Sequence, residues 1–192
     1  MANNCDTTYK IVGSRRAIDN LWHTLSVTFE GNGHDIRLYK LAEHYGIDYE
    51  QRYISVRGHV YYIERDCQDV LTICTDTAWA GCHDLFYAIN KVLDDELSIS
   101  YMEIEPGMEI FCVHDEDGFF GEECILYADG KRFDYQYEEL FATIEDAINF
   151  WCERMGIERD TSLSQKQYLD MIDKYEYDDE DTYFNLYTFT YE

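Results

Sequence analysis

The stretch that decides the fold is Leu71–Gly118, LTICTDTAWAGCHDLFYAINKVLDDELSISYMEIEPGMEIFCVHDEDG. It begins with a run rich in β-branched residues, continues with apolar residues at helical spacing, and returns to an alternating run over 97–104. These periods predict a strand, a helix and a strand in that order. Pro106, the only proline in the chain, stands between Glu105 and Gly107. Because proline and glycine interrupt regular structure, this tripeptide predicts the turn that ends the second strand.

The residues before this stretch predict a matching half. A β-type run at 7–12 is followed by apolar residues at helical spacing over 18–25, and a second β-rich run covers 53–63. With an additional short helix at 36–45, the predicted order is strand, helix, helix, strand, strand, helix, strand. That order is typical of the split β-α-β arrangement of a ferredoxin-like sandwich, in which helices cover one face of an antiparallel sheet. We therefore expect an α+β fold of this type, with an insertion at 31–52.

The remaining residues predict additions to this sandwich. Short strand candidates lie between 108 and 137, and Asp129 followed by Gly130 is a strong hairpin signal between two of them. We expect these hairpins to extend the sheet, so that one domain spans 1–140. Residues 141–192 predict a helical region and a final aromatic strand that pack on the same domain.

Capping residues mark two helix starts in this region. Thr143 precedes an apolar stripe that stops at Gly156, and Ser164 with Gln167 forms a capping box. We therefore expect helices to begin directly after Thr143 and Ser164.

The charge is large and unevenly distributed. The chain has 40 Asp and Glu against 15 Lys and Arg, a formal net charge of −25. Residues 94–192 hold 28 acidic and 6 basic residues, a net of −22, whereas residues 1–93 have a net of −3. Such a field repels phosphate backbones and anionic lipid and attracts basic partners. We expect no direct nucleic-acid binding, although Arg52, Arg57, His59 and Arg65 form a modest basic cluster. The candidate acidic interaction run consists of Glu176, Asp178, Asp179, Glu180 and Asp181.

Cysteine usage and hydropathy indicate the compartment. There are seven cysteines, an odd number, and no two are spaced C-x-x-C. A secreted disulfide framework favours an even number in a shorter chain, so these residues predict reduced thiols. The N-terminal residues have no basic segment followed by an apolar one, and no run approaches the length of a membrane span. We expect a soluble, cytoplasmic protein that does not bind membranes; the sequence leaves its oligomeric state open.

Two segments carry metal-ligand residue types. Cys82-His83 opens the central helix, and Cys112 and His114 lie near the end of a later strand, which is a candidate for zinc. Adjacent cysteine and histidine side chains point in different directions, and the spacing matches no zinc module. In the segment 114–118, HDEDG, glycine comes too early for an EF-hand loop and strands flank it, so a β-turn is favoured over calcium. We expect no metal and no cofactor.

The catalytic alternative rests on paired carboxylates. Glu103 and Glu105 alternate with Ile104, so they share one face of their strand, and such pairs can perform acid–base chemistry. Trp79 and Tyr101 are the aromatic residues that would line a pocket with them. No Gly-rich phosphate loop, G-x-S-x-G or H-E-x-x-H motif is present, and with 40 acidic residues such a pair is expected by chance. We expect a non-enzymatic protein.

Several short motifs carry a resemblance to a known family. They are Asn4-Cys5 before a strand that stops at Gly13, Val56-Arg57-Gly58, Thr77-Ala78-Trp79, and Tyr101 leading into Glu105-Pro106-Gly107. With them the sequence resembles the YubB-type ferredoxin-like proteins carried by bacterial plasmids and phages, over about 3–25 and 53–118. It departs from them at Ala80-Gly81, where the family has proline after its tryptophan. The resemblance implies a ferredoxin-like fold without iron–sulfur clusters, and it implies no activity.

Three functional hypotheses follow. The first is a soluble bacterial mobile-element protein that acts as an acidic protein–protein interaction module on a basic partner. The second is a DNA mimic, an antirestriction-type decoy whose carboxylates occupy the groove of a basic DNA-binding protein. The third is a small-molecule-binding or catalytic site at the end of the sheet that holds Trp79, Glu103 and Glu105.

Overall fold

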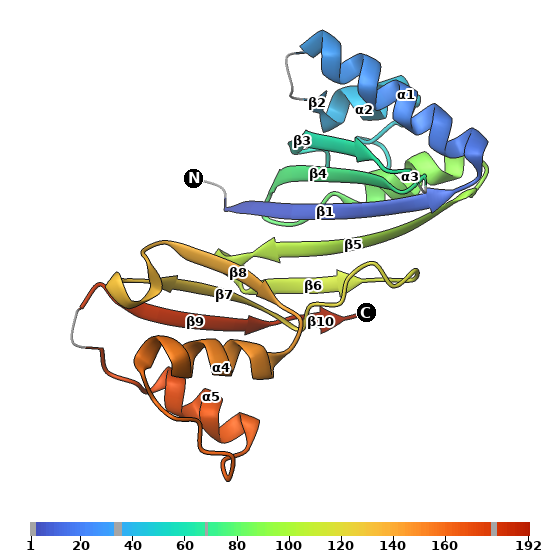
Figure 1. Cartoon of the computed structure of the whole chain (residues 1–192). Helices are drawn as coiled ribbons and strands as arrows, with labels where there is room; N and C mark the ends of the chain where they lie inside the picture. Colours follow the sequence, from blue (N-terminus) through green and yellow to red (C-terminus); the bar gives the residue numbers. More distant parts are fainter. Residues whose placement is uncertain (1–2, 33–35, 68, 178–179) are drawn as a thin grey trace. The chain divides into compact units, whose positions relative to one another are not determined.

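The computed structural model describes residues 3–32, 36–67, 69–177 and 180–192 (Figure 1). Within these ranges the fold is mixed α+β, with five α-helices and two mostly antiparallel sheets. The contacts divide the chain into two compact units, residues 1–120 with 191–192, and residues 121–190. None of the described helices has the length and hydrophobicity that a membrane span requires.

The larger sheet has seven strands in the order β10-β6-β5-β1-β4-β3-β2. Its centre is β1, which pairs antiparallel with β4 on one side and β5 on the other. The strands are β1 (Asn4–Gly13), β2 (Ile36–Arg37), β3 (Gly58–Arg65), β4 (Leu71–Ala78), β5 (Leu97–Glu105), β6 (Ile110–His114) and β10 (Thr190–Tyr191). The stretch Leu71–Gly118 therefore supplies strands from both halves of this sheet.

One face of this sheet is covered by helices α1 (Arg15–Asn32), α2 (Leu38–His44) and α3 (His83–Val92). Burial along β1 alternates, as expected for a strand whose successive side chains point to opposite faces. The inward residues Tyr9 and Ile11 share one hydrophobic core with Leu21 of α1 and Phe86 of α3. The alternate, less buried positions of β1 are polar as far as residue 10.

The predicted second strand begins at Gly58 rather than at Tyr53. Residues 49–53 form a turn and residues 54–57 are irregular, and Tyr53 adopts a positive φ of 55°, which a strand does not tolerate. A glycine inside a strand often marks a bulge, but the register shift of β3 lies between Val60 and Tyr62 rather than at Gly58. The glycine has a different role, because a Cβ there would lie 2.4 Å from the carbonyl oxygen of Asp76 on the neighbouring strand.

The second unit packs two helices on a three-stranded sheet. The sheet order is β8-β7-β9, from strands β7 (Cys124–Asp129), β8 (Tyr137–Phe141) and β9 (Tyr183–Thr188). Helices α4 (Ile144–Met155) and α5 (Gln165–Asp173) bury Trp151, Ile148 and Tyr168 against Leu126 and Phe184 of the strands. The final aromatic strand thus pairs within the chain, with β7.

Both predicted capping signals are confirmed. The Thr143 hydroxyl accepts a hydrogen bond from the Asp146 N–H at 3.1 Å, and Gly156 ends α4 with φ 68°. The Ser164 hydroxyl and the Gln167 side chain form the reciprocal capping box of α5.

Two features of this region differ from the sequence prediction. Of the strand candidates between 108 and 137, only β6 extends the larger sheet, and the segment from 121 onward builds a sheet and core of its own. The expected tight hairpin after Asp129 is also longer. Phe133 is fully buried in a 3₁₀ turn, η2 (Lys131–Phe133), and the next three residues, 134–136, have left-handed φ angles of 59°, 58° and 48°. Because the Phe133 ring is buried in this turn, β8 begins only at Tyr137.

Candidate functional site

The residues of the predicted pocket separate into three buried side chains and one exposed ring. Tyr101, Glu103 and Glu105 lie on one face of β5, as their alternation predicts, and are 7%, 6% and 1% exposed. Trp79, in the loop after β4, is 42% exposed and has a left-handed φ of 77°. The three β5 residues therefore do not form an open pocket together with Trp79.

Glu105 is a capping residue. Its carboxylate accepts hydrogen bonds from the N–H groups of Gly107, at 3.1 Å, and Met108, and so closes the 3₁₀ turn η1 (Pro106–Met108). Pro106 occupies the first position of that turn, where its missing N–H costs nothing. Glu105 thus stabilises the turn that the sequence predicts and leaves no oxygen open to a substrate.

Glu103 lies at the centre of a buried hydrogen-bond network. Its Oε1 accepts bonds from the Gly81 N–H at 2.7 Å and the Cys5 thiol at 3.3 Å, and its Oε2 lies 2.7 Å from His83 Nε2. Burial alone would raise the pKa of Glu103, but the bonds from His83 and Gly81 outweigh it and hold the pKa below its ordinary value. The carboxylate is therefore anionic and fully occupied.

His83, the first residue of α3, connects this network to the core. Its Nδ1 lies 3.1 Å from the Tyr9 hydroxyl, so both ring nitrogens have partners. The ring stacks on Tyr101 with centroids 3.7 Å apart, and Tyr101 in turn lies 5.3 Å from the ring of His114. Burial raises the pKa of Tyr9 well above its ordinary value, which keeps that hydroxyl protonated.

This arrangement does not suit nucleophilic catalysis. A thiol nucleophile needs a base beside it, with the carboxylate on the far side of the base. Here the carboxylate of Glu103 lies between the thiol and the imidazole. Burial and the Glu103 charge raise the pKa of Cys5 to about 12, so the thiol stays protonated at neutral pH. The network instead ties α3 to β1 and β5, and we refer to Cys5, Tyr9, His83 and Glu103 as the Glu103 network.

The metal-ligand residue types do not converge in the described residues. No group of three or more His, Cys, Asp or Glu side chains is placed there to hold a metal ion. The Cys82 thiol donates to the Ser55 hydroxyl at 3.6 Å, while His83 belongs to the Glu103 network. In the 114–118 segment, the Asp115 carboxylate accepts N–H bonds from Gly118 and the residues that follow, which is the pattern of a self-contained turn.

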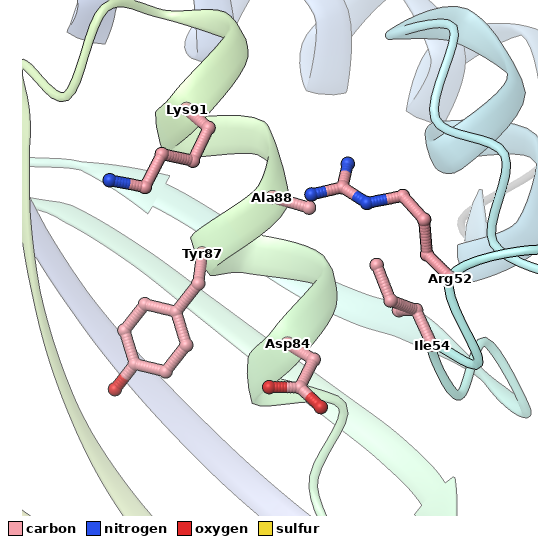
Figure 2. Close-up of a pocket in the computed structure, with 6 residues that line it drawn as sticks. All are labelled: Arg52, Ile54, Asp84, Tyr87, Ala88 and Lys91. Carbon is pink, nitrogen blue, oxygen red and sulfur yellow. The ribbon is translucent and has the colours of Figure 1, made fainter.

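Described residues outside this network also line surface hollows. In the first unit, a hollow of about 350 Å³ runs along α3 beside the loop that precedes β3 (Figure 2). We call it the α3 hollow; it is lined by Arg52, Ile54, Asp84, Tyr87, Ala88 and Lys91. The sequence pointed to Arg52 only as part of a basic cluster. The spacing of 84, 87, 88 and 91, which places these residues on one helix face, was the available signal.

The second hollow belongs to the second unit and has a volume of about 810 Å³. We call it the acidic hollow; it is lined by Asp129, Gly130, Tyr135, Gln136, Glu180, Asp181 and Tyr183. Two members of the predicted acidic run, Glu180 and Asp181, therefore line it, and Glu176 is an exposed residue before it. Asp178 and Asp179 lie outside the described residues.

Comparison of the chain with protein-family models, with curated proteins and with solved structures gave no match. The geometry of the Glu103 network, the α3 hollow and the acidic hollow is therefore the basis for a functional proposal.

Proposed function

We propose that the protein is a non-enzymatic interaction module that binds a basic protein through the acidic hollow of its second unit. The observation that carries this proposal is the composition of the hollow: three carboxylates and two tyrosines line it, and no lysine or arginine is among its described lining residues. Tyr135 and Tyr183 are 62% and 43% exposed. Carboxylates beside exposed aromatic faces suit an arginine or lysine side chain, through charge-assisted hydrogen bonds and cation–π contact.

The strands position these groups. Asp129 at the end of β7 pairs directly with Tyr183 at the start of β9, so a carboxylate and a phenol ring are adjacent on the sheet. Tyr135 is held by a bond from its N–H to the Gly130 carbonyl at 3.2 Å. The hollow is thus built on strand ends and on a turn whose backbone is fixed.

The charge of the second unit supports the same partner chemistry. Residues 121–190 carry 18 Asp and Glu and 6 Lys and Arg, a net charge of −12. A field of this sign accelerates encounter with a basic protein and loses strength as salt rises. The DNA-mimic hypothesis is a narrower form of this proposal, in which the basic partner is a DNA-binding protein.

The strand order supports a proposal about the first unit. We infer that its central strands, in the order β5-β1-β4-β3, belong to a ferredoxin-like split β-α-β sandwich. In support, β1 pairs antiparallel with β4 and β5, and β3 with β4. Kinship with the YubB-type proteins stays a prediction from the short motifs.

Peptide binding tests the functional proposal. A hexa-arginine peptide titrated into the protein at low salt should bind saturably, and the affinity should fall as ionic strength rises. Asp129→Asn with Glu180→Gln should weaken binding about tenfold or more, the effect of losing charged hydrogen bonds. The matched control, Glu138→Gln with Glu139→Gln, removes the same charge from exposed positions on β8. Equal losses in the two variants would show that overall charge, rather than the hollow, binds the peptide, and absence of binding at low salt would refute the proposal.

A further inference from the structure

The α3 hollow combines a polar rim with an apolar floor. Asp84, Tyr87, Ala88 and Lys91 are spaced so that they follow one face of α3. Figure 2 shows Arg52 extending from the facing loop toward Ala88, with Ile54 beside it and Asp84 one turn earlier on the helix. A volume of about 350 Å³ lies at the small end of the range for ligand sites, which suits a molecule of few heavy atoms.

The loop that carries Arg52 is held in place by its own hydrogen bonds. The N–H of Arg52 donates to the Asp48 carbonyl at 3.1 Å, and the N–H of Ile54 donates to the Tyr49 carbonyl at 2.9 Å. Ile54 also packs against the hydrophobic core. The guanidinium is therefore presented from a fixed backbone, so binding an anion there costs little loop ordering.

Arg52 has no carboxylate partner among the described residues, whereas other cations of this unit do. Arg16 pairs with Asp94 at 2.7 Å and Arg65 with Asp19 at 2.8 Å. Lys91, in the same hollow as Arg52, bonds Asp95 at 2.9 Å. The unpaired guanidinium is thus the cation in the hollow that is open to an anionic ligand.

Asp84 is the matching anion. It is exposed in the first turn of α3, and no ion pair joins it to Arg52 or to another described cation, although both line the same hollow. An unpaired cation and an unpaired anion that do not reach each other fit a ligand carrying both opposite charges. Ile54 and Ala88 offer such a ligand an apolar surface.

We propose that the α3 hollow binds a zwitterion of the α-amino-acid class with an apolar side chain. The carboxylate of the ligand accepts hydrogen bonds from the guanidinium of Arg52, and its ammonium donates to the carboxylate of Asp84. The apolar side chain of the ligand packs on Ile54 and Ala88. A guanidinium can bind a carboxylate through two parallel hydrogen bonds, which gives orientation as well as attraction. This site is independent of the acidic hollow and of its basic partner.

The test is an amide-resolved NMR titration of the full chain with three matched probes. L-phenylalanine carries both charges, 3-phenylpropionate lacks the ammonium, and 2-phenylethylamine lacks the carboxylate. Phenylalanine should shift the amides of 52–54 and 84–91 saturably, and each singly charged probe should bind about tenfold more weakly, as expected for one lost charged hydrogen bond. No saturable shift in these amides, or equal affinity for the three probes, would overturn the proposal.

Variants separate the two charges. Arg52→Gln should weaken phenylalanine binding about tenfold or more, whereas Arg57→Gln, at an exposed arginine outside the hollow, should leave it unchanged. Asp84→Asn should bring phenylalanine and 3-phenylpropionate to similar affinities, because it removes the negative charge that attracts the ammonium of the one and repels the lone carboxylate of the other. An equal loss in the Arg57 and Arg52 variants would contradict the site. Amide dispersion in the same spectra reports whether each variant is folded, and Arg52→Lys, which keeps the charge, should retain part of the affinity.

Discussion

The Glu103 network contains one carboxylate and the acidic hollow three, and the two places differ in how exposed these carboxylates are. Glu103 is 6% exposed and its oxygens are occupied by an imidazole, a backbone N–H and a thiol. The acidic hollow is lined by Glu180 and Asp181, which are exposed, beside two exposed tyrosine rings. A buried carboxylate with a full set of partners stabilises the fold, whereas an exposed carboxylate such as that of Glu180 faces solvent.

The largest expected effect is the loss of the Glu103 carboxylate. Glu103→Ala leaves His83, the Gly81 N–H and the Cys5 thiol without their acceptor in a buried site. Removing one partner of a buried pair typically costs about 3–5 kcal/mol of unfolding free energy. Urea unfolding should show this loss, with Glu43→Ala on the exposed side of α2 as a control that changes stability by less than about 0.5 kcal/mol. A loss of that small size in Glu103→Ala would contradict the structural role of the network.

The pH dependence of stability tests the same carboxylate. The pKa of Glu103 is held below its ordinary value in the folded state, so the unfolded chain binds a proton at this residue more readily. The stabilisation is therefore complete above the unfolded pKa of about 4.3 and is lost as the pH falls through the lower folded pKa.

Glu103→Gln, which cannot titrate, isolates this contribution. The unfolding free energy of the wild type should exceed that of the variant at pH 7, and the difference should shrink as the pH is lowered below about 4.3. Equilibrium urea unfolding at a series of pH values measures the difference. A gap between the two proteins that is independent of pH would contradict the assigned pKa direction.

An intermediate effect is expected at Glu105, whose role is capping. Glu105→Ala removes the acceptor for the N–H groups of Gly107 and Met108. Loss of a side-chain cap typically costs about 0.5–2 kcal/mol, less than the loss expected at Glu103. The same urea experiment should therefore rank Glu105→Ala between Glu103→Ala and the Glu43→Ala control. A loss equal to that of Glu103→Ala would mean that the two glutamates belong to one network.

The order of elements and the helix caps were accessible from sequence because they depend on local chemistry. Thr143, Ser164 and the Glu105 turn each act on backbone groups within a few residues, and the structure places them as predicted. The shared face of Glu103 and Glu105 likewise follows from strand alternation.

What the sequence did not provide is set by contacts between distant segments. The partner of Glu103 across the sheet, Cys5, lies 98 residues away, and no periodicity identifies it. The late start of β8 follows from the burial of Phe133, which depends on the core that α4 and α5 build. The α3 hollow depends on a loop residue, Arg52, that meets the helix only after folding. Contacts between distant elements, and sites that a loop forms with a helix, can therefore be identified only from the three-dimensional structure.

The smallest expected effect on stability is at the acidic hollow, where substitution of carboxylates should cost far less unfolding free energy than at Glu103. Asp129→Asn with Glu180→Gln removes two negative charges from a unit of net charge −12 while keeping side chains of the same shape. Glu180 is exposed, and an asparagine side chain in place of Asp129 can still accept the bond from the Gly130 N–H. The unfolding free energy should therefore change by less than about 0.5 kcal/mol. Relief of like-charge repulsion favours a small gain over a loss. A variant that unfolds readily would place these carboxylates with Glu103 as structural groups, whereas a stable variant that no longer binds basic peptide would show that the rim acts on a partner.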